Sequence, residues 1–142
     1  MFKRKSKTSD EFLHIVKEHI PSGYMLIERP MTGSLAGYAL FIREINCEPI
    51  TDRERLFVFL HECGHVHYGH LRKGANAPRW LEEFEADQYA ISAMKTHGIS
   101  IPKHISTHHK SEVRRLIEED GETVDDIRVL KYAYGKNWRK HQ

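Results

Sequence analysis

The feature that most constrains the fold is an apolar segment that runs directly into a histidine-rich one. Residues 56–60 are all apolar, and residues 61–65 read His-Glu-Cys-Gly-His. Thr51 and Glu54, three residues apart just before them, form a capping box, which predicts the start of a helix. Because this segment is apolar on nearly every side, we expect a largely buried helix from residue 51 to about residue 70.

The histidines of this helix have the spacing of a zinc site. His61 and His65 lie four residues apart, so they share one face of the helix, and their ring nitrogens can reach one zinc ion. Glu62 between them is placed to act as the general base towards a water molecule at the metal. Catalytic zinc takes three protein ligands and keeps its fourth position open, so a third ligand must come from elsewhere in the chain.

A second acidic helix offers that ligand. The His-Glu-x-x-His pattern occurs by chance in about 8% of chains with this many histidines, so its surroundings decide its meaning. On a helix predicted from Pro78 to about His97, Glu83 and Asp87 lie at i and i+4 on one face. We predict Glu83 as the third ligand and Asp87 as the acceptor for the other nitrogen of a ligand imidazole. Glu85, which points roughly 200° away from Glu83, is the second choice.

The other histidines and the cysteine of the motif fit plainer roles. Gly64 lets another segment approach the helix closely, and Cys63 is expected to pack as a small apolar residue. His67 and His70 suit surface or capping positions. His108-His109 has no partner motif and receives no role. The oxyanion of a peptidase would need a further donor, and the sequence leaves three tyrosines unranked for it: Tyr68, Tyr132 and Tyr134.

The rest of the chain predicts a mostly helical α+β domain with a small sheet near the N-terminus. Phe12, Val16 and Ile20 recur every four residues, which predicts a first helix over residues 9–20. Two strands are expected after it, at 24–28 and 37–46, as a hairpin or in a small sheet. Helices are expected from about residue 100 to before Gly121 and, capped by Thr123, through Tyr134.

Length and composition bound the class of protein. A chain of 142 residues fits a single domain, 1–142, with basic tails at 1–8 and 136–142 that we expect to be flexible. The net charge of +2 makes no case for direct nucleic-acid binding. No apolar run is long enough for a signal peptide or a membrane span. The two cysteines, Cys47 and Cys63, are expected to be reduced thiols, which favours the cytoplasm.

Together the two motifs resemble those of the ImmA/IrrE family of zinc metallopeptidases. The resemblance rests on His-Glu-Cys-Gly-His at 61–65 and on Glu-Phe-Glu-Ala-Asp-Gln-Tyr-Ala at 83–90, and it covers residues 51–98 well. It implies a minimal, gluzincin-like zincin fold. It also implies cleavage of an intracellular protein, such as a helix-turn-helix transcriptional repressor of a phage or mobile element.

Three functions follow as expectations. The first is a zinc endopeptidase with Zn²⁺ on His61, His65 and Glu83 and with Glu62 as the catalytic base. The second is a non-catalytic zinc-binding regulatory or interaction module. The third is a helical interaction protein without a metal. A base beside the metal ligands favours the first, because a structural zinc site has no use for one.

Overall fold

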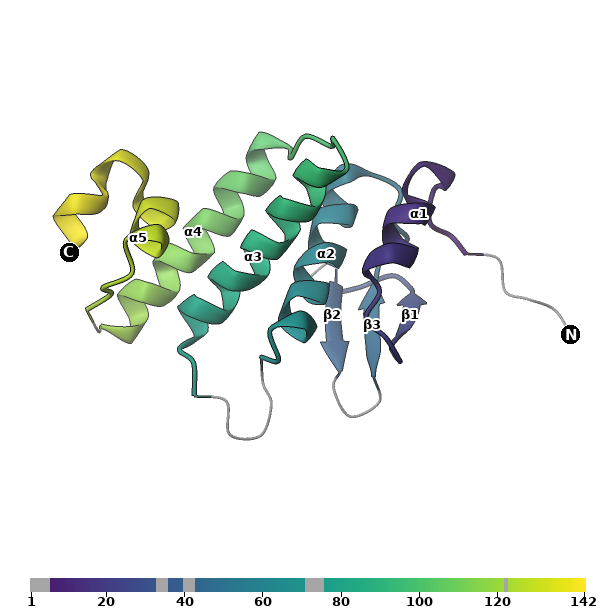
Figure 1. Ribbon diagram of the computed structural model, residues 1–142, viewed down its shortest axis with the longest axis horizontal. Helices are drawn as coiled ribbons and strands as arrows, with labels where there is room; N and C mark the ends of the chain where they lie inside the picture. The colour runs from purple at the N-terminus through teal and green to yellow at the C-terminus, as the bar shows by residue number, and fades with distance from the viewer. Residues whose placement is uncertain (1–5, 33–35, 40–42, 71–75, 122) are drawn as a thin grey trace, which may run out of the picture.

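A computed structural model describes residues 6–32, 36–39, 43–70, 76–121 and 123–142. Figure 1 shows a small sheet with α1 at one end of the molecule, followed by α2, α3, α4 and α5. Within the described residues the elements are α1 (Asp10–His19), β1 (Met25–Glu28), β2 (Ala36–Ala39), β3 (Glu44–Cys47), α2 (Arg53–His67), α3 (Arg79–Thr96), α4 (Lys103–Asp120), α5 (Ile127–Tyr134) and the 3₁₀-helix η1 (Gly135–His141). The protein is thus mostly helical with a small sheet near its N-terminus, as the sequence predicts.

The sheet differs from the predicted pair of strands. The single strand expected over 37–46 is wrong, because its two ends form separate strands, β2 and β3, that pair antiparallel; residues 40–42 between them lie outside the described part of the chain. The strand order is β1-β3-β2, with β1 and β3 parallel. Residues 37–46 are rich in strand-forming side chains, and such a composition does not mark where one strand ends and the next begins.

The helix boundaries follow local capping chemistry. Asp52, not Thr51, caps α2: its carboxylate accepts a hydrogen bond from the Arg55 backbone N–H at 2.8 Å. A carboxylate serves this position as well as a hydroxyl does and also suits the positive end of the helix dipole. In the same way Asp126, not Thr123, caps α5. Both predicted caps are therefore wrong by a few residues, while both helices exist.

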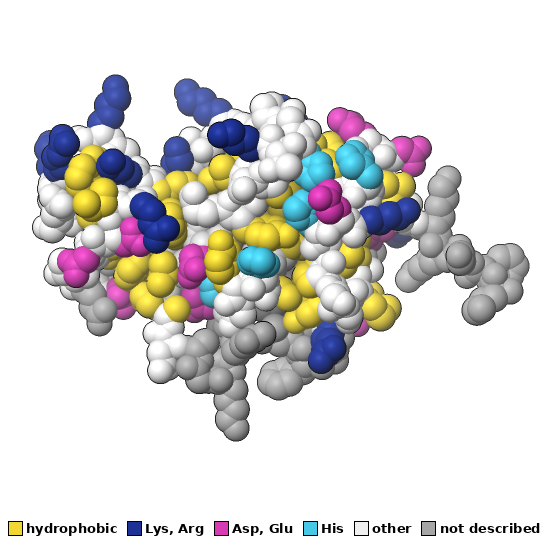
Figure 2. All heavy atoms as spheres, in the orientation of Figure 1, with side chains coloured by type: hydrophobic (Ala, Val, Ile, Leu, Met, Phe, Trp, Pro, Cys, Tyr) yellow, Lys and Arg dark blue, Asp and Glu magenta, His cyan; other side chains and the backbone are white. Residues whose placement is uncertain are grey.

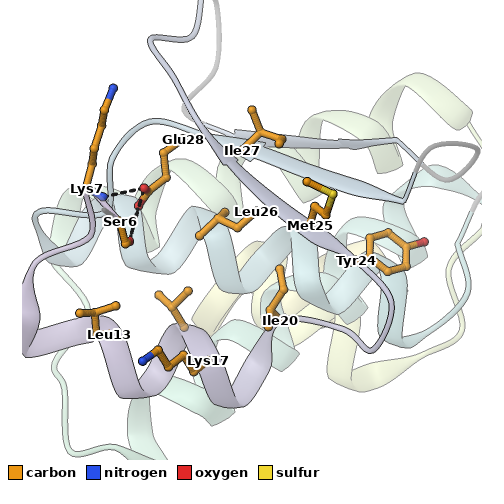
Figure 3. Close-up of a pocket in the computed structure, with 11 residues that line it drawn as sticks. Ser6, Lys7, Leu13, Lys17, Ile20, Tyr24, Met25, Leu26, Ile27 and Glu28 are labelled. Carbon is orange, nitrogen blue, oxygen red and sulfur yellow. Dashed lines mark hydrogen bonds between the residues drawn. The ribbon is translucent and has the colours of Figure 1, made fainter. Parts of the chain in front are cut away.

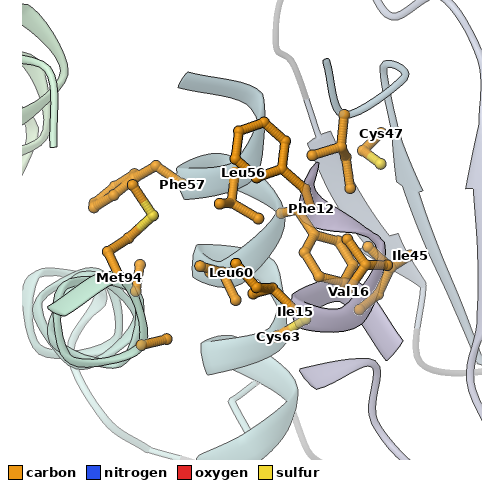
Figure 4. Close-up of a cluster of buried hydrophobic side chains, with 14 of the residues drawn as sticks. Phe12, Ile15, Val16, Ile45, Cys47, Leu56, Phe57, Leu60, Cys63 and Met94 are labelled. Atoms are coloured by element: carbon orange, nitrogen blue, oxygen red, sulfur yellow. The ribbon is translucent and has the colours of Figure 1, made fainter. Parts of the chain in front are cut away.

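Two apolar clusters hold the layers together. The larger joins α1, β3, α2 and α3 (Figure 4), and its buried members include Phe12, Ile15, Ile45, Phe57, Leu60, Cys63 and Met94. The smaller joins α3, α4 and α5 and contains Phe84, Val113, Ile117, Val124, Val129, Leu130 and Ala133. Because α3 contributes to both clusters, it fixes the sheet-side half of the molecule to the C-terminal helices.

The chain ends and the cysteines complete the comparison with the sequence. Residues 136–142, expected as a tail, instead fall largely in η1. Residues 1–5 of the other expected tail lie outside the described residues, but Thr8 is buried and its hydroxyl bonds to the Glu28 carboxylate. Cys47 and Cys63 are both buried free thiols, as predicted.

Candidate metal centre

The candidate centre lies where α2 and α3 approach each other, and Gly64 makes that approach possible. A Cβ atom at residue 64 would lie 2.9 Å from both the Cα of Ala86 and the Cβ of Tyr89. Real side chains do not tolerate such contacts, so glycine is required for α3 to come this close. The predicted role of Gly64 in close packing is confirmed, and the partner is the very helix that carries the acidic motif.

Three side chains from these two helices converge on one point. His61 Nε2 lies 2.9 Å from Glu83 Oε2, and His65 Nε2 lies 3.3 Å from Glu83 Oε1. The two Nε2 atoms are 3.0 Å apart. Both histidines are buried, whereas the Glu83 side chain keeps 31% of its surface exposed. The predicted donor set of His61, His65 and Glu83 is thus brought together by the fold.

Asp87 fixes the orientation of the His61 ring. His61 Nδ1 lies 2.7 Å from Asp87 Oδ1, and Asp87 is only 1% exposed. Burial raises the pKa of this carboxyl, but hydrogen bonds from His109 and His61 outweigh it and lower the pKa below its ordinary value. An ionised carboxylate only accepts hydrogen bonds, so His61 donates its Nδ1–H. Its Nε2 then faces Glu83 and His65.

A second relay fixes the His65 ring. His65 Nδ1 lies 2.9 Å from His70 Nδ1, and His70 Nε2 lies 3.4 Å from Glu85 Oε1. If His70 donates to the Glu85 carboxylate, its Nδ1 accepts the Nδ1–H of His65, and the Nε2 of His65 presents a lone pair. Burial lowers the pKa of His70, which keeps the ring neutral as this relay requires. Glu85, the second-choice ligand, therefore contacts His70 and not the three-donor cluster.

The charges of His61 and Glu83 depend on each other because the donor atoms lie so close together. The Nε2 atoms of His61 and His65 and the Glu83 carboxylate face one another at 2.9 to 3.3 Å. Burial lowers the pKa of His61, but hydrogen bonds to Asp87 and Glu83 dominate and raise it to about 10. The same histidines hold the pKa of Glu83 far below its ordinary value despite burial, which acts in the opposite direction. His61 and Glu83 thus share a proton at this point, and a metal ion with N, N and O ligands could take the place of that proton.

Another set of possible ligands shares His61. His61, Asp87 and His109 also offer donor atoms within 4.8 Å of one another. However, the Asp87 oxygens already accept hydrogen bonds from His61, His109 and Tyr132, at 2.7, 2.9 and 2.7 Å. Asp87 is also almost inaccessible, whereas a catalytic metal needs an open position. The group with Glu83 fits an ion better.

Glu62 follows His61 on α2, and its carboxyl interacts electrostatically with the cluster. Burial, together with the negative charge of Glu83, raises the pKa of Glu62 above its ordinary value, while the charges of His61 and His65 act in the opposite direction. These influences place the carboxyl within electrostatic reach of all three donors. A raised pKa brings a carboxyl closer to the range in which it can both take and return a proton.

Sequence reasoning missed several residues of this network. His109 and Tyr132 bond to Asp87, and His70 bonds to His65, although the sequence gives His109 no role and places His70 at the surface. His70 is in fact only 4% exposed. Three tyrosines are considered as hydrogen-bond donors to the oxyanion. Of these, Tyr132 donates its hydroxyl hydrogen bond to Asp87, and Tyr134 donates to Glu118. No local motif marks the contacts of His109 and Tyr132, because α4 and α5 supply them from far along the chain, whereas His70 lies just after α2.

One cavity borders the centre, and another lies in the N-terminal part of the protein. The first has a volume of about 380 Å³ and is lined by Arg79, Glu83, Asp87, His108, His109, Glu112 and Leu116. The other, of about 500 Å³, lies between α1 and β1 (Figure 3), with a mainly apolar wall that includes Leu13, Ile20 and Leu26. The first cavity is the one that gives access to Glu83.

Comparisons with known proteins add no relative to this picture. No protein-family model, curated protein or solved structure matches the chain. The resemblance to the ImmA/IrrE family therefore stays a prediction from the two motifs. Among the described residues, no helix is both long and apolar enough to cross a membrane.

Proposed function

We propose that this protein is a zinc-dependent endopeptidase of the ImmA/IrrE type. The observation that carries the proposal is the convergence of His61, His65 and Glu83 on one point, with Glu62 next to it. Each histidine has its Nδ1 engaged elsewhere, so each Nε2 is oriented towards that point. Orienting partners of this kind are typical of metal-binding histidines.

The chemistry divides between the metal and Glu62. A bound zinc ion supplies Lewis acidity, which polarises a carbonyl and makes water more acidic. The Glu62 carboxylate takes the proton of the attacking water and returns it to the leaving amine. Asp87, bonded to His109 and Tyr132, holds His61 in place during these steps.

The sheet offers a way to bind an extended substrate. β2 is an edge strand, and it packs against α2, the helix that carries the two histidines. An extended peptide that pairs with the free edge of β2 would therefore run beside the active-site helix. This arrangement supports a protein or peptide substrate over a small molecule.

The resemblance supplies the biological setting of the proposal. It supports a cytoplasmic protein substrate, such as a helix-turn-helix transcriptional repressor of a phage or mobile element. The alternative is a non-catalytic zinc-binding module that regulates or binds another protein. Glu62 separates the two functions, because only the peptidase needs its carboxylate.

Glu62→Gln tests the catalytic part of the proposal. The amide keeps the size of the side chain but cannot take a proton, so we expect full zinc binding and a loss of cleavage of about 10²–10⁴-fold. Cleavage is measured on a fluorogenic peptide library and on regulators encoded near the gene, co-expressed with either form. Glu54→Gln is the matched control, because it makes the same change on the same helix at an exposed pair with His104.

The outcomes are distinct. Cleavage by the wild type and Glu54→Gln but not by Glu62→Gln supports the peptidase. Equal cleavage by Glu62→Gln rules out its role as base. Stoichiometric zinc binding with no cleavage by any form favours the non-catalytic module.

A further inference from the structure

A second group of metal-binding side chains lies where α1 and α3 end. Glu18 and His19 are on the last turn of α1, and His97 is the residue that caps α3. His19 Nε2 lies 3.2 Å from His97 Nε2, and His97 Nε2 lies 3.1 Å from Glu18 Oε2. We name Glu18, His19 and His97 the α1–α3 cluster; it shares no residue with the centre on α2.

The His19 ring is held by a partner on its far side. His19 Nδ1 lies 2.8 Å from the Tyr89 hydroxyl. When Nδ1–H donates to the tyrosine oxygen, the Nε2 of His19 presents a lone pair towards His97 and Glu18. The arrangement matches that of His61 with Asp87, with a phenol in place of the carboxylate.

The position of the cluster also favours a cation. Both α1 and α3 direct their C-terminal ends towards it, and the carbonyl end of a helix carries partial negative charge. Figure 2 shows histidine and acidic side chains gathered at the surface between α1 and the end of α3. The Glu18 side chain is 59% exposed, so an ion can enter from solution without any opening of the core.

We propose that Glu18, His19 and His97 form a second metal site, which takes a divalent transition metal such as Zn²⁺ and ties α1 to α3. Two imidazoles and one carboxylate are the donor types that zinc prefers, and water completes the coordination. The site is separate from the proposed peptidase centre and does not depend on it. A metal bound there would stabilise the contact between α1 and α3, the helix that carries Glu83 and Asp87.

Zinc stoichiometry tests the proposal directly. After equilibrium dialysis against buffered Zn²⁺, the wild type should hold two equivalents by metal analysis. His97→Gln and Glu18→Gln should each hold one equivalent, because each removes a ligand of the α1–α3 cluster only. His104→Gln is the control and should hold two, since His104 is a 70% exposed histidine with a single carboxylate neighbour.

A variant of the first centre separates the two sites. His65→Gln should lose one equivalent and keep the one that His97→Gln loses. Circular dichroism checks the fold of each variant. Because Glu18 is exposed, Glu18→Gln removes a ligand without disturbing the packing of the core.

Two equivalents in both His97→Gln and Glu18→Gln would overturn the proposal. One equivalent in the wild type that disappears in His65→Gln would overturn it too, while leaving the peptidase centre intact. One equivalent that disappears in His97→Gln and persists in His65→Gln would support the α1–α3 site and count against the peptidase.

Discussion

At the scale of single residues, Glu83 and Glu85 of α3 have different tasks although they stand two positions apart. Glu83 faces both Nε2 atoms of the histidine pair, whereas Glu85 contacts His70 at 3.4 Å. The helix repeat sends them to different faces, so only one reaches the centre directly. The other acts through the His70 and His65 rings.

The zinc affinities of Glu83→Gln and Glu85→Gln measure the difference between these two roles. We expect Glu83→Gln to weaken zinc binding by more than about 100-fold, since outer partners already account for roughly 10–100-fold. Glu85→Gln should weaken it by less than about tenfold, because the amide oxygen still accepts the hydrogen bond of His70. Competition with a chromophoric chelator in the His97→Gln background gives both affinities for one site. Equal losses in the two variants would contradict the assignment of Glu83.

At the scale of elements, α3 organises the site because it contacts helices on both of its sides. Gly64 lets α2 lie against it at Ala86 and Tyr89, and Asp87 bonds in the other direction to His109 of α4 and Tyr132 of α5. The Tyr132 hydroxyl and the Asp87 carboxylate are 2.7 Å apart. This bond connects the C-terminal helix to the orientation of a metal ligand.

Tyr132→Phe tests that connection. It leaves a buried carboxylate oxygen without its donor, so we expect a loss of about 1–3 kcal/mol in the free energy of unfolding, measured in urea. Tyr134→Phe is the matched control on the same helix. Its hydroxyl bonds at 3.4 Å to Glu118 at the surface, so its loss should stay within about 0.5 kcal/mol. A Tyr132→Phe protein as stable as the control would show that Asp87 does not need this donor.

At the scale of the whole molecule, a metal held by α2 and α3 would join two helices that belong to the apolar core. α2 packs in the larger apolar cluster, and α3 packs in both. A metal ion bound there would add to the stabilisation that the proton between His61 and Glu83 already provides. Folding and metal binding should therefore be coupled.

Removal of zinc tests this coupling. In the His97→Gln background, free zinc at 100 times the dissociation constant should add about 2.7 kcal/mol to the free energy of unfolding relative to excess chelator. The added stability should disappear in the His65→Gln, His97→Gln double variant. Urea unfolding with and without zinc measures both. An unchanged midpoint in the single variant would show that the native state binds zinc no better than the unfolded chain does.

The sequence by itself determined the parts of the site that depend on helical spacing. His61 with His65, and Glu83 with Asp87, are pairs at i and i+4, and the helix repeat alone puts each pair on one face. The close approach at Gly64 was also predictable, because glycine inside a helix costs stability unless something needs the space. The helices themselves were predictable from capping and periodicity, to within a few residues at their ends.

Only the tertiary structure decided how these faces meet and what supports them. His109, Tyr132 and His70 reach the centre because α4, α5 and the end of α2 pack around it, and no local pattern records that packing. The α1–α3 cluster likewise joins residues 78 positions apart. The split of residues 37–46 into two strands has the same origin, since pairing partners and not local apolarity decide where a strand ends. Spacing within a helix is a local property of the backbone, whereas the approach of two helices depends on every side chain between them.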